Sequence, residues 1–496
     1  MLEFLKKEAK PKMTYTENGA ATYATSGSFC LDFFSCAGAI RYESEKAIIS
    51  RFSKAYIEDP DLAVKLLFFT RDIRGGLGER RVFRILVRWL CKNRPESIRK
   101  NIRYFSEFGR YDDLLCLLGT PLEEAAVEEI GSVLAADIRA MEKDEPVSLL
   151  GKWLPSVNAS SSRTVKQAKI LIRLLGMTEA SYRKTLSALR RRIRIIENSL
   201  REKDYTFDYG SQPSRALFKY RAAFRRNDEE RYVAFLESVS RGEKTMHTKN
   251  VAPYELVMPY LQNTLRVQDA FAMSRGEEQV LNTTWEALPD YVGSGRSLAV
   301  IDTSGSMYMS RTGIAPAAVA LSLGLYFAER IDGEFRDHFI SFSEHPQLIR
   351  IKGRTFVDRL RYVISKQEVA NTNIEAVFDL ILRTAVKHHL PKSEMPDRIF
   401  ILSDMEFDMC AKGAGLTNFE SAKKRFSIYG YALPQIVFWN VASRNTQVPV
   451  KMNEQGVILL SGVTPMLFSM ATKGDIDPYA FMMSVIGNER YEQICA

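Results

Sequence analysis

Five oxygen-bearing side chains in the C-terminal part of the chain have the types and the order of a divalent-cation site. They are Asp302, Ser304, Ser306, Thr372 and Asp404. The first three form a D-x-S-x-S motif, and a hard cation such as Mg²⁺ takes oxygen ligands of this kind in near-octahedral geometry. Two hydroxyls beside few carboxylates neutralise the ion only partly, so it stays electrophilic toward an outside ligand. We therefore expect Mg²⁺, or another divalent cation such as Mn²⁺.

The elements around these residues are expected to bring them together. An apolar run at 298–301 precedes Asp302, and a second at 398–402 precedes Asp404. Further strands are expected at 338–342, 348–351, 436–441 and 457–460, alternating with helices at 316–330, 355–366, 374–388, 465–471 and 479–486. This alternation, with strands that are apolar throughout, predicts a mainly parallel, doubly wound, Rossmann-like sheet. The site would lie at the carboxyl ends of its strands, at a topological switch point.

Residues 44–290 predict an all-α fold instead. The clearest helix is expected over 178–200, where apolar residues recur at spacings of four and three. Many short amphipathic helices and almost no strand patterns indicate a repeat-like helical array. We therefore expect a multidomain protein with an irregular segment at 1–43, a basic helical domain at 44–290 and an α/β domain at 297–496.

The net positive charge of the chain comes entirely from residues 1–296. The 69 Lys+Arg exceed the 60 Asp+Glu by nine, whereas residues 297–496 hold 21 of each. A basic region beside a neutral one favours an anionic partner, and small structured RNA is the candidate. The residues expected to contact RNA are Arg71, Arg74, Arg80, Arg81, Arg183, Arg190, Arg191, Arg194 and Arg225.

Local patterns support that candidate in three places. Arginines surround a glycine-rich break at 75–78, and backbone amides at a helix start can hold a phosphate. Arginines also cover much of the 178–200 helix, and Arg225 lies near Tyr220 and Phe224, so charge alternates with stacking groups. The alternative stays open that the glycines only stop a helix and that the arginines form a solvated face.

Other classes of protein and site are not favoured. The six cysteines form no C-x-x-C pair, which is typical of buried thiols in a reducing compartment. The N-terminus lacks a long apolar core, and no stretch reaches the roughly 18 apolar residues of a membrane span. A P-loop, an H-E-x-x-H motif and a G-x-S-x-G elbow are missing. We expect a cytoplasmic protein that is not an enzyme and not a membrane protein.

The region from Ser297 resembles a von Willebrand factor A domain with a metal-ion-dependent adhesion site. The resemblance implies that Ser304 and Ser306 coordinate the ion directly and that Thr372 does so directly or through water. It implies that Asp302 and Asp404 act directly or through water, and that a partner protein supplies a carboxylate. The family usually has a glycine after the last aspartate. Here 405–408 reads Met-Glu-Phe-Asp, so Glu406 or Asp408 is expected to shape or block the site.

The whole chain resembles a little-characterised family that pairs a helical N-terminal region with such an A domain. The segments that carry the resemblance are 16–20 (TENGA), 71–76 (RDIRGG), 152–155 (KWLP) and 402–407 (LSDMEF). More loosely, the architecture is similar to that of the Ro ribonucleoprotein (TROVE) class. Those proteins close helical repeats into a ring, joined by an A domain, and bind small and misfolded RNAs. This second similarity is an analogy of architecture.

Two functions are therefore expected. The first is a non-enzymatic, Ro-like scaffold whose helical half binds RNA and whose A domain docks a partner through the metal ion. The alternative is a protein-only adaptor, in which the metal site binds a partner carboxylate and no RNA is involved. Retention of RNA that weakens with salt would separate them. The oligomeric state does not follow from the sequence.

Overall fold

The computed structural model describes residues 13–261, 274–308, 314–342, 345–366, 373–407, 417–443, 445–471 and 477–496. It divides into two compact units that alternate along the sequence. The α/β unit contains 13–44, 51–58 and 235–488, and the helical unit contains 45–50, 59–234 and 489–496. The expected division into consecutive domains follows sequence patterns alone, whereas the units follow spatial contacts. Two helices, α3 (Glu45–Glu58) and α14 (Glu229–Ser240), run from one unit into the other.

Within the described parts of the chain, the α/β unit has a six-stranded sheet in the order β5-β4-β3-β6-β7-β8. Its strands are β3 (Ser297–Asp302), β4 (His338–Phe342), β5 (Leu348–Arg350), β6 (Arg398–Ser403), β7 (Gln435–Asn440) and β8 (Val457–Ser461). All pairs are parallel except β4 with the edge strand β5. Each expected strand is present within two residues of its expected ends, which confirms a mainly parallel sheet beside a helical region.

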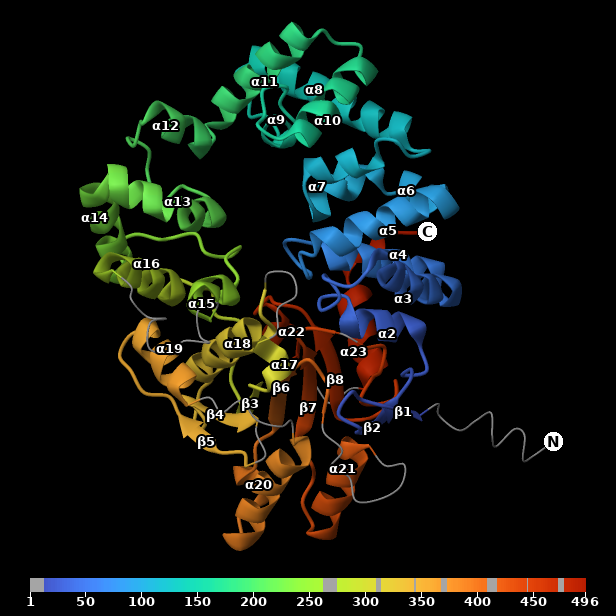
Figure 1. Cartoon of the computed structure of the whole chain (residues 1–496), viewed down its shortest axis with the longest axis vertical. Helices are drawn as coiled ribbons and strands as arrows, with labels where there is room; N and C mark the ends of the chain where they lie inside the picture. The colour runs from blue at the N-terminus through green and yellow to red at the C-terminus, as the bar shows by residue number, and fades with distance from the viewer. Residues whose placement is uncertain are drawn as a thin grey trace, which may run out of the picture. The chain divides into compact units, whose positions relative to one another are not determined.

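Helices cover both faces of this sheet, as expected for continuously apolar strands (Figure 1). On one face, α20 (Ile374–Lys387) and α21 (Asn418–Ile428) join the core residues of β3, β6 and β7. On the other face, α18 (Pro316–Arg330) crosses β3 so closely that a Cβ at Gly324 would lie 2.3 Å from Ile301 Cδ1. A larger residue at 324 would force the Ile301 side chain to move, so Gly324 lets α18 lie close against the strand that leads into the D-x-S-x-S motif.

The remaining helices of this unit complete its shell. They are α2 (Phe29–Cys36), α15 (Pro253–Leu261), α16 (Arg275–Glu286), α17 (Gly305–Tyr308), α19 (Phe356–Ser365), η3 (Lys392–Glu394), α22 (Leu467–Ala471) and α23 (Pro478–Ile486). Local sequence signals define where several helices of this unit begin. Pro316 is the first residue of α18, where its missing N–H costs nothing, and Thr355 and Asp358 form a capping box at α19.

The segment expected to be irregular is partly ordered. Residues 13–23 form a hairpin of β1 (Met13–Tyr15) and β2 (Ala21–Tyr23), and Tyr23 bonds to Val448 of the same unit. The hairpin loop closes through Thr16, whose N–H and Oγ bond to Ala20 O and Ala20 N, both at 2.9 Å. Gly19 supplies the positive φ that the turn requires. Strands of three residues are too short for alternation to be recognised in the sequence.

The helical unit agrees with the expected all-α class. Its elements are α4 (Pro60–Arg71), α5 (Arg80–Asn93), α6 (Pro95–Arg99), η1 (Ile102–Tyr104), α7 (Phe105–Phe108), η2 (Tyr111–Leu117), α8 (Glu123–Glu142), α9 (Leu150–Trp153), α10 (Ser162–Leu174), α11 (Glu179–Ile193), α12 (Ile196–Glu202), α13 (Ser214–Asn227) and α24 (Glu489–Glu492). The prediction of a single helix over 178–200 is wrong. Arg194 adopts a left-handed conformation (φ 52°) that ends α11, and α12 begins at Ile196. No helix among the described residues is both long and apolar enough to cross a membrane.

Candidate metal centre

The sheet topology brings the two motif aspartates side by side. The order β5-β4-β3-β6-β7-β8 means that crossovers leave β3 toward β4 on one side, whereas β6 lies on the other. Doubly wound sheets bind ligands at this switch point, outside the carboxyl ends of the strands. Asp302 is the last residue of β3, and Asp404 follows the end of β6. The parallel register pairs Ile301 with Leu402, so Asp302 lies level with Ser403, and Asp404 follows one residue beyond it at the same edge of the sheet.

Hydrogen bonds join the carboxylates to the serines of the motif. Ser304 N donates to Asp302 Oδ1 at 2.9 Å, and Ser403 Oγ donates to Asp302 Oδ2 at 2.5 Å. The hydroxyls of Ser304 and Ser306 lie 3.0 Å apart, and Ser306 Oγ donates to Asp404 Oδ2 at 2.9 Å. Four of the five expected site residues therefore meet at one place, and the fifth, Thr372, lies outside the described residues.

Among the described residues, no basic side chain balances the charge of Asp302. Asp302 and Asp404 are 0% and 2% exposed. Burial, and secondly the charge of Asp404, raise the pKa of Asp302 to about 7, although hydrogen bonds from Ser403 and Ser304 oppose the shift. In the described parts of the chain, no Lys, Arg or His nitrogen lies within salt-bridge distance of Asp302. Two buried carboxylates beside two hydroxyls suit a divalent cation.

This arrangement is poor in anionic ligands. Among the described residues, no group of three or more His, Cys, Asp and Glu has a geometry that could hold a metal ion. A cation at Asp302 and Asp404 would depend on serine hydroxyls and water for its other positions. Such a ligand set would leave a bound ion electrophilic.

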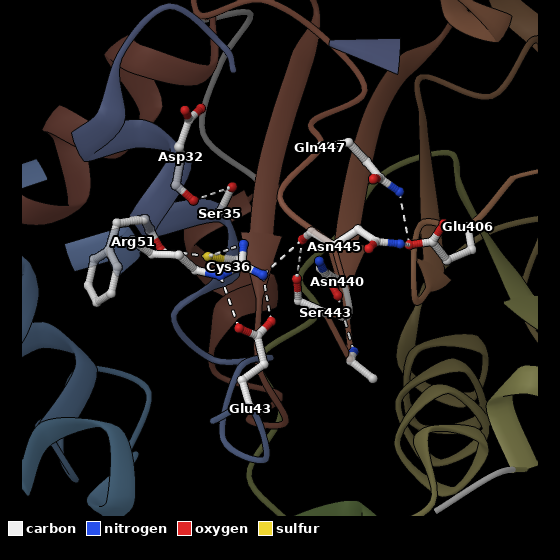
Figure 2. Close-up of polar contacts among 12 residues, drawn as sticks. Asp32, Ser35, Cys36, Glu43, Arg51, Glu406, Asn440, Ser443, Asn445 and Gln447 are labelled. Atoms are coloured by element: carbon white, nitrogen blue, oxygen red, sulfur yellow. Dashed lines mark hydrogen bonds and ion pairs between the residues drawn. The ribbon is translucent and has the colours of Figure 1, made fainter. Parts of the chain in front are cut away.

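Glu406 does not close over the aspartates. Its carboxylate is buried and accepts hydrogen bonds from Glu17 N (2.8 Å), Asn445 Nδ2 (2.8 Å) and Gln447 Nε2 (2.9 Å). Figure 2 shows the side chain pointing toward Asn445 and Gln447. Burial in the first place, and also the charge of Asp404, raise the pKa of Glu406. We interpret Glu406 as a residue that shapes the site, whereas Asp408 lies outside the described residues.

A second polar cluster borders Asn445 on its other side (Figure 2). Arg51 forms two hydrogen bonds with the Glu43 carboxylate, at 3.1 and 2.5 Å, and donates to Asn445 O at 3.0 Å. Its Nη1 also lies 3.9 Å from Cys36 Sγ. Burial raises the pKa of the Cys36 thiol to about 11, so this cysteine is protonated at neutral pH and is not an activated nucleophile. The cluster holds Asn445 in place.

Two of the expected RNA-binding arginines are structural. Arg71 is 2% exposed, and its Nε lies 2.7 Å from Asp113 Oδ2. Arg190 donates to Gly151 O and Leu154 O, both at 2.9 Å, and to Ser156 Oγ at 2.6 Å. A guanidinium whose donors are used in this way is not available to a phosphate. The expected roles of Arg71 and Arg190 are therefore corrected: they hold the helical unit together.

The glycine-rich break is not a free anion cradle either. Two of its amides bond to nearby carbonyl groups: Leu77 N donates to Phe69 O of α4, and Gly78 N donates to Asp72 O, both at 3.1 Å. The buried carboxylate of Asp72 instead accepts from Arg490 Nη2 at 2.8 Å and from Tyr491 OH at 3.0 Å. The break therefore contacts residues 490–491 of the same unit. Asp72 and Arg490 are 418 positions apart in the sequence.

The other candidate arginines are more accessible. Arg74, Arg80, Arg81, Arg183, Arg191 and Arg194 are exposed, and Arg225 is half-buried. Arg80 pairs with Asp112, and Arg225 lies 2.9 Å from Glu229 Oε1. Phe224 is fully buried against Tyr209 and Tyr232, so it cannot serve as a stacking platform for bases.

The sequence patterns did not point to one basic residue, Arg110. The Arg110 guanidinium lies 4.5 Å from the ring centroid of Trp153, and Lys152 Nζ lies 5.7 Å from the same ring. The guanidinium makes no hydrogen bond or ion pair with any described residue. Burial and the like charges of Arg71, Arg215 and Arg80 lower the pKa of Arg110, against the effect of Asp112. The segment 152–155, which carried the family resemblance, was the only sequence signal that pointed here.

Known proteins are similar to this chain in sequence and in structure. The family described as "Domain of unknown function (DUF7788)" matches residues 296–480. "Uncharacterized protein L728" of Acanthamoeba polyphaga mimivirus is 28% identical over 516 residues, which cover 96% of this chain and 87% of that protein. The crystal structure of the Deinococcus radiodurans RO (RSR) protein covers 93% of this chain and 100% of its own, at 12% identity and a TM-score of 0.34. A TM-score this low supports no inference about fold or ligand.

A second family covers the N-terminal part. The family described as "Domain of unknown function (DUF2828)" matches residues 16–144 and 173–295, so that the two family matches meet between residues 295 and 296. Its match includes the hairpin loop at 16–20 and the glycine-rich break, and it amounts to more than half of the chain. The chain therefore belongs to the DUF2828 family.

Proposed function

We propose that the α/β unit is a von Willebrand A-type docking module that binds Mg²⁺, or another divalent cation such as Mn²⁺. The observation that carries this proposal is the pair of buried aspartates facing two serine hydroxyls at the switch point of the sheet. Ser304 and Ser306 would hold the ion directly, and Thr372 directly or through water. Asp302 and Asp404 supply the charge, directly or through water. The bound ion would attract a carboxylate of a partner protein.

Such a site docks a ligand without transforming it, so the function is that of a non-enzymatic scaffold. A cation held by hydroxyls and few carboxylates keeps an exchangeable position for an anionic group. The described residues around Asp302 and Asp404 offer serine hydroxyls that bond to each other or to these carboxylates. These contacts position an ion rather than activate a nucleophile.

Titration with Mn²⁺, followed by electron paramagnetic resonance, tests the site. The wild type should bind one ion, and the double variant Ser304→Ala/Ser306→Ala should lose it. Ser322→Ala is the matched control, because Ser322 is a buried serine of the same unit that only bonds to Val319 O at 3.0 Å. Equal Mn²⁺ binding by the wild type and the double variant would refute the site.

RNA binding by the helical unit is the second candidate. Three exposed arginines on or directly after α11, Arg183, Arg191 and Arg194, support it. The Arg110 guanidinium over the Trp153 ring also supports it, because it makes no hydrogen bond or ion pair with any described residue. Contact with phosphates would make affinity fall steeply with salt. If this candidate fails, the protein-only adaptor remains, with the metal site as its docking point.

Filter binding of single-stranded and hairpin RNA at several salt concentrations tests the RNA candidate. Arg183, Arg191 and Arg194 together changed to Glu should weaken binding and reduce the salt slope by roughly two, at about 0.7 per lost phosphate contact. The matched control changes Arg336, Arg350 and Arg354, which are exposed on the α/β unit, to Glu. Equal loss in both triple variants would show only a non-specific effect of charge.

A further inference from the structure

The loop that carries Asp404 has an unusual backbone conformation. Met405 is buried and has a positive φ of 68°, a region that side-chain-bearing residues other than Asn and Asp seldom adopt. The family to which the metal site is similar usually has a glycine after this aspartate. A non-glycine residue in this conformation persists only where the surroundings hold it. The structure therefore has to supply contacts that keep residues 404–407 in place.

Two backbone N–H groups of the loop bond to neighbouring side chains. Met405 N donates to Ser403 Oγ at 3.0 Å, and Glu406 N donates to Asp404 Oδ1 at 3.2 Å. The second bond matters for the metal site, because it orients the carboxylate that also accepts from Ser306. Any movement of the Glu406 backbone would rotate or release Asp404. The position of Glu406 therefore determines the position of a proposed metal ligand.

The N-terminal hairpin fixes one side of this loop. Asn18 Nδ2 donates to Glu406 O at 2.7 Å, and Thr16 Oγ1 donates to Phe407 O at 2.6 Å. Glu17 N donates to Glu406 Oε2 at 2.8 Å. Three consecutive residues of the hairpin loop thus bond to two consecutive residues of the metal-site loop, although 388 to 391 positions separate the partners in the sequence.

The segment at 445–447 fixes the other side. Asn445 Nδ2 and Gln447 Nε2 both donate to Glu406 Oε1, at 2.8 and 2.9 Å (Figure 2). The buried carboxylate of Glu406 therefore accepts from two sides at once, from the hairpin and from this segment. An isolated buried carboxylate would be costly, whereas one that accepts several N–H groups is held in a single orientation.

We propose that Glu406 is a positioning residue of the metal site, which fixes Asp404 by joining the hairpin loop at 16–18 to Asn445 and Gln447. The inference rests on the proposed metal-binding function. The proposal assigns one role to the hairpin loop at 16–20 and to Met405 and Glu406. Where the resembling family usually has a glycine, this loop is held in place by hydrogen bonds from 16–18 and from Asn445 and Gln447. Loss of such outer support typically weakens metal affinity about 10- to 100-fold.

The first experiment compares Mn²⁺ affinity and thermal unfolding in Glu406→Gln and the wild type. A carboxamide has one acceptor oxygen, so one of the opposing N–H groups would face its NH₂ group. We expect Mn²⁺ to bind at least about tenfold more weakly, measured well below the unfolding temperature. The matched control is Asp137→Asn. Asp137 is a buried carboxylate of the helical unit that accepts from Ser148 N and Oγ, both at 2.7 Å, and its loss should lower the unfolding temperature without changing Mn²⁺ affinity.

A reciprocal variant separates positioning from mere stability. In Glu406→Gln/Gln447→Glu, the new NH₂ group at position 406 can donate to the carboxylate introduced at position 447, while the carboxamide oxygen accepts from Glu17 N. Asn445 can rotate its amide to accept from the same NH₂ group. We expect Mn²⁺ affinity to return to within about threefold of the wild type, a coupling that independent sites would not show.

The outcomes distinguish this inference from the proposed function. Failure of the wild type to bind Mn²⁺, or equal binding by Asp302→Ala, overturns the metal site and this inference with it. Wild-type affinity in Glu406→Gln overturns this inference alone. If Glu406→Gln does not fold, the milder pair Thr16→Val/Asn18→Ala decides: weaker Mn²⁺ binding supports the bracing role, and unchanged binding refutes it.

Discussion

Each unit of this protein buries a pair of aspartates, but the two pairs have different surroundings. In the helical unit, Asp113 lies 2.7 Å from both Arg71 Nε and Arg84 Nε, and Asp112 pairs with Arg80 and with Arg84. In the α/β unit, the partners of the buried Asp302 are hydroxyl and backbone N–H groups. The first pair carries its counter-charges within the fold.

The comparison explains what each pair does. A buried carboxylate without a counter-charge is costly, and a fold normally avoids it or pairs it. Where arginines provide the counter-charge, the pair is part of the framework and the local chemistry is complete. Where hydroxyls and amides surround a carboxylate such as Asp302, a cation from outside completes the site. The helical pair is therefore structural, and the α/β pair is the candidate binding site.

The largest expected effect comes from removing a cation of the helical pair. Arg71→Met would leave Asp113 buried beside fewer positive charges, and we expect a loss of about 3–5 kcal/mol of unfolding free energy. Urea unfolding followed by circular dichroism measures it. Arg183→Met, at an exposed position of α11, should change stability by less than about 0.5 kcal/mol. A loss below about 1 kcal/mol for Arg71→Met would show that Arg80 and Arg84 suffice.

The next effect comes from supplying a cation to the other pair. At a Mn²⁺ or Mg²⁺ concentration about one hundred times the dissociation constant, we expect a stabilisation of about 2.7 kcal/mol, because the ion binds only the folded α/β unit. Differential scanning calorimetry with and without a chelator measures it. In Asp302→Ala the response should vanish. If neither the cation nor the chelator changes the unfolding temperature of the wild type, the proposed difference between the two pairs is contradicted.

A neutralising substitution should have opposite signs in the two pairs. In metal-free protein at about pH 8, Asp302→Asn removes a buried charge and its repulsion from Asp404, and we expect a gain of at least about 1 kcal/mol. Asp113→Asn leaves buried arginines without their partner, and we expect a loss. Chemical unfolding of both variants in the presence of chelator provides the measurement. Destabilisation of similar size in both would mean that Asp302 is already neutralised within the protein.

The smallest expected effect is a pH dependence confined to the α/β unit. Burial raises the pKa of Asp302 from 3.8 to about 7, so the folded state holds this proton more tightly than the unfolded state. Stability from this group is fully present below about pH 3.8 and is lost progressively as pH rises to and through about 7. We expect metal-free wild type to lose on the order of 1 kcal/mol between about pH 6 and 8, and Asp302→Asn to lose less. Identical pH profiles for the two proteins would argue against the shift.

Much of the α/β unit could be predicted from local patterns. Strands that are apolar throughout, separated by helices, have few alternatives to a buried parallel sheet, and the expected strands lie close to the observed ones. The helical class of the other unit followed from apolar spacing, but its breaks did not. Arg194 ends α11 in a left-handed conformation that no glycine or proline announces. The three-residue strands of the N-terminal hairpin gave no recognisable period.

The sequence by itself determined the types and order of the site residues. A strand that ends in Asp302 and another followed by Asp404 must place them at the same edge of a parallel sheet. Only the tertiary structure decided which charges are balanced within the fold. Arg71 and Asp113 are 42 positions apart, and Glu406 meets Glu17 across 389 positions. Whether a charged side chain binds a ligand or holds the fold depends on its neighbours in space. Coulomb and hydrogen-bond energies act over a few ångströms, whatever the separation along the chain.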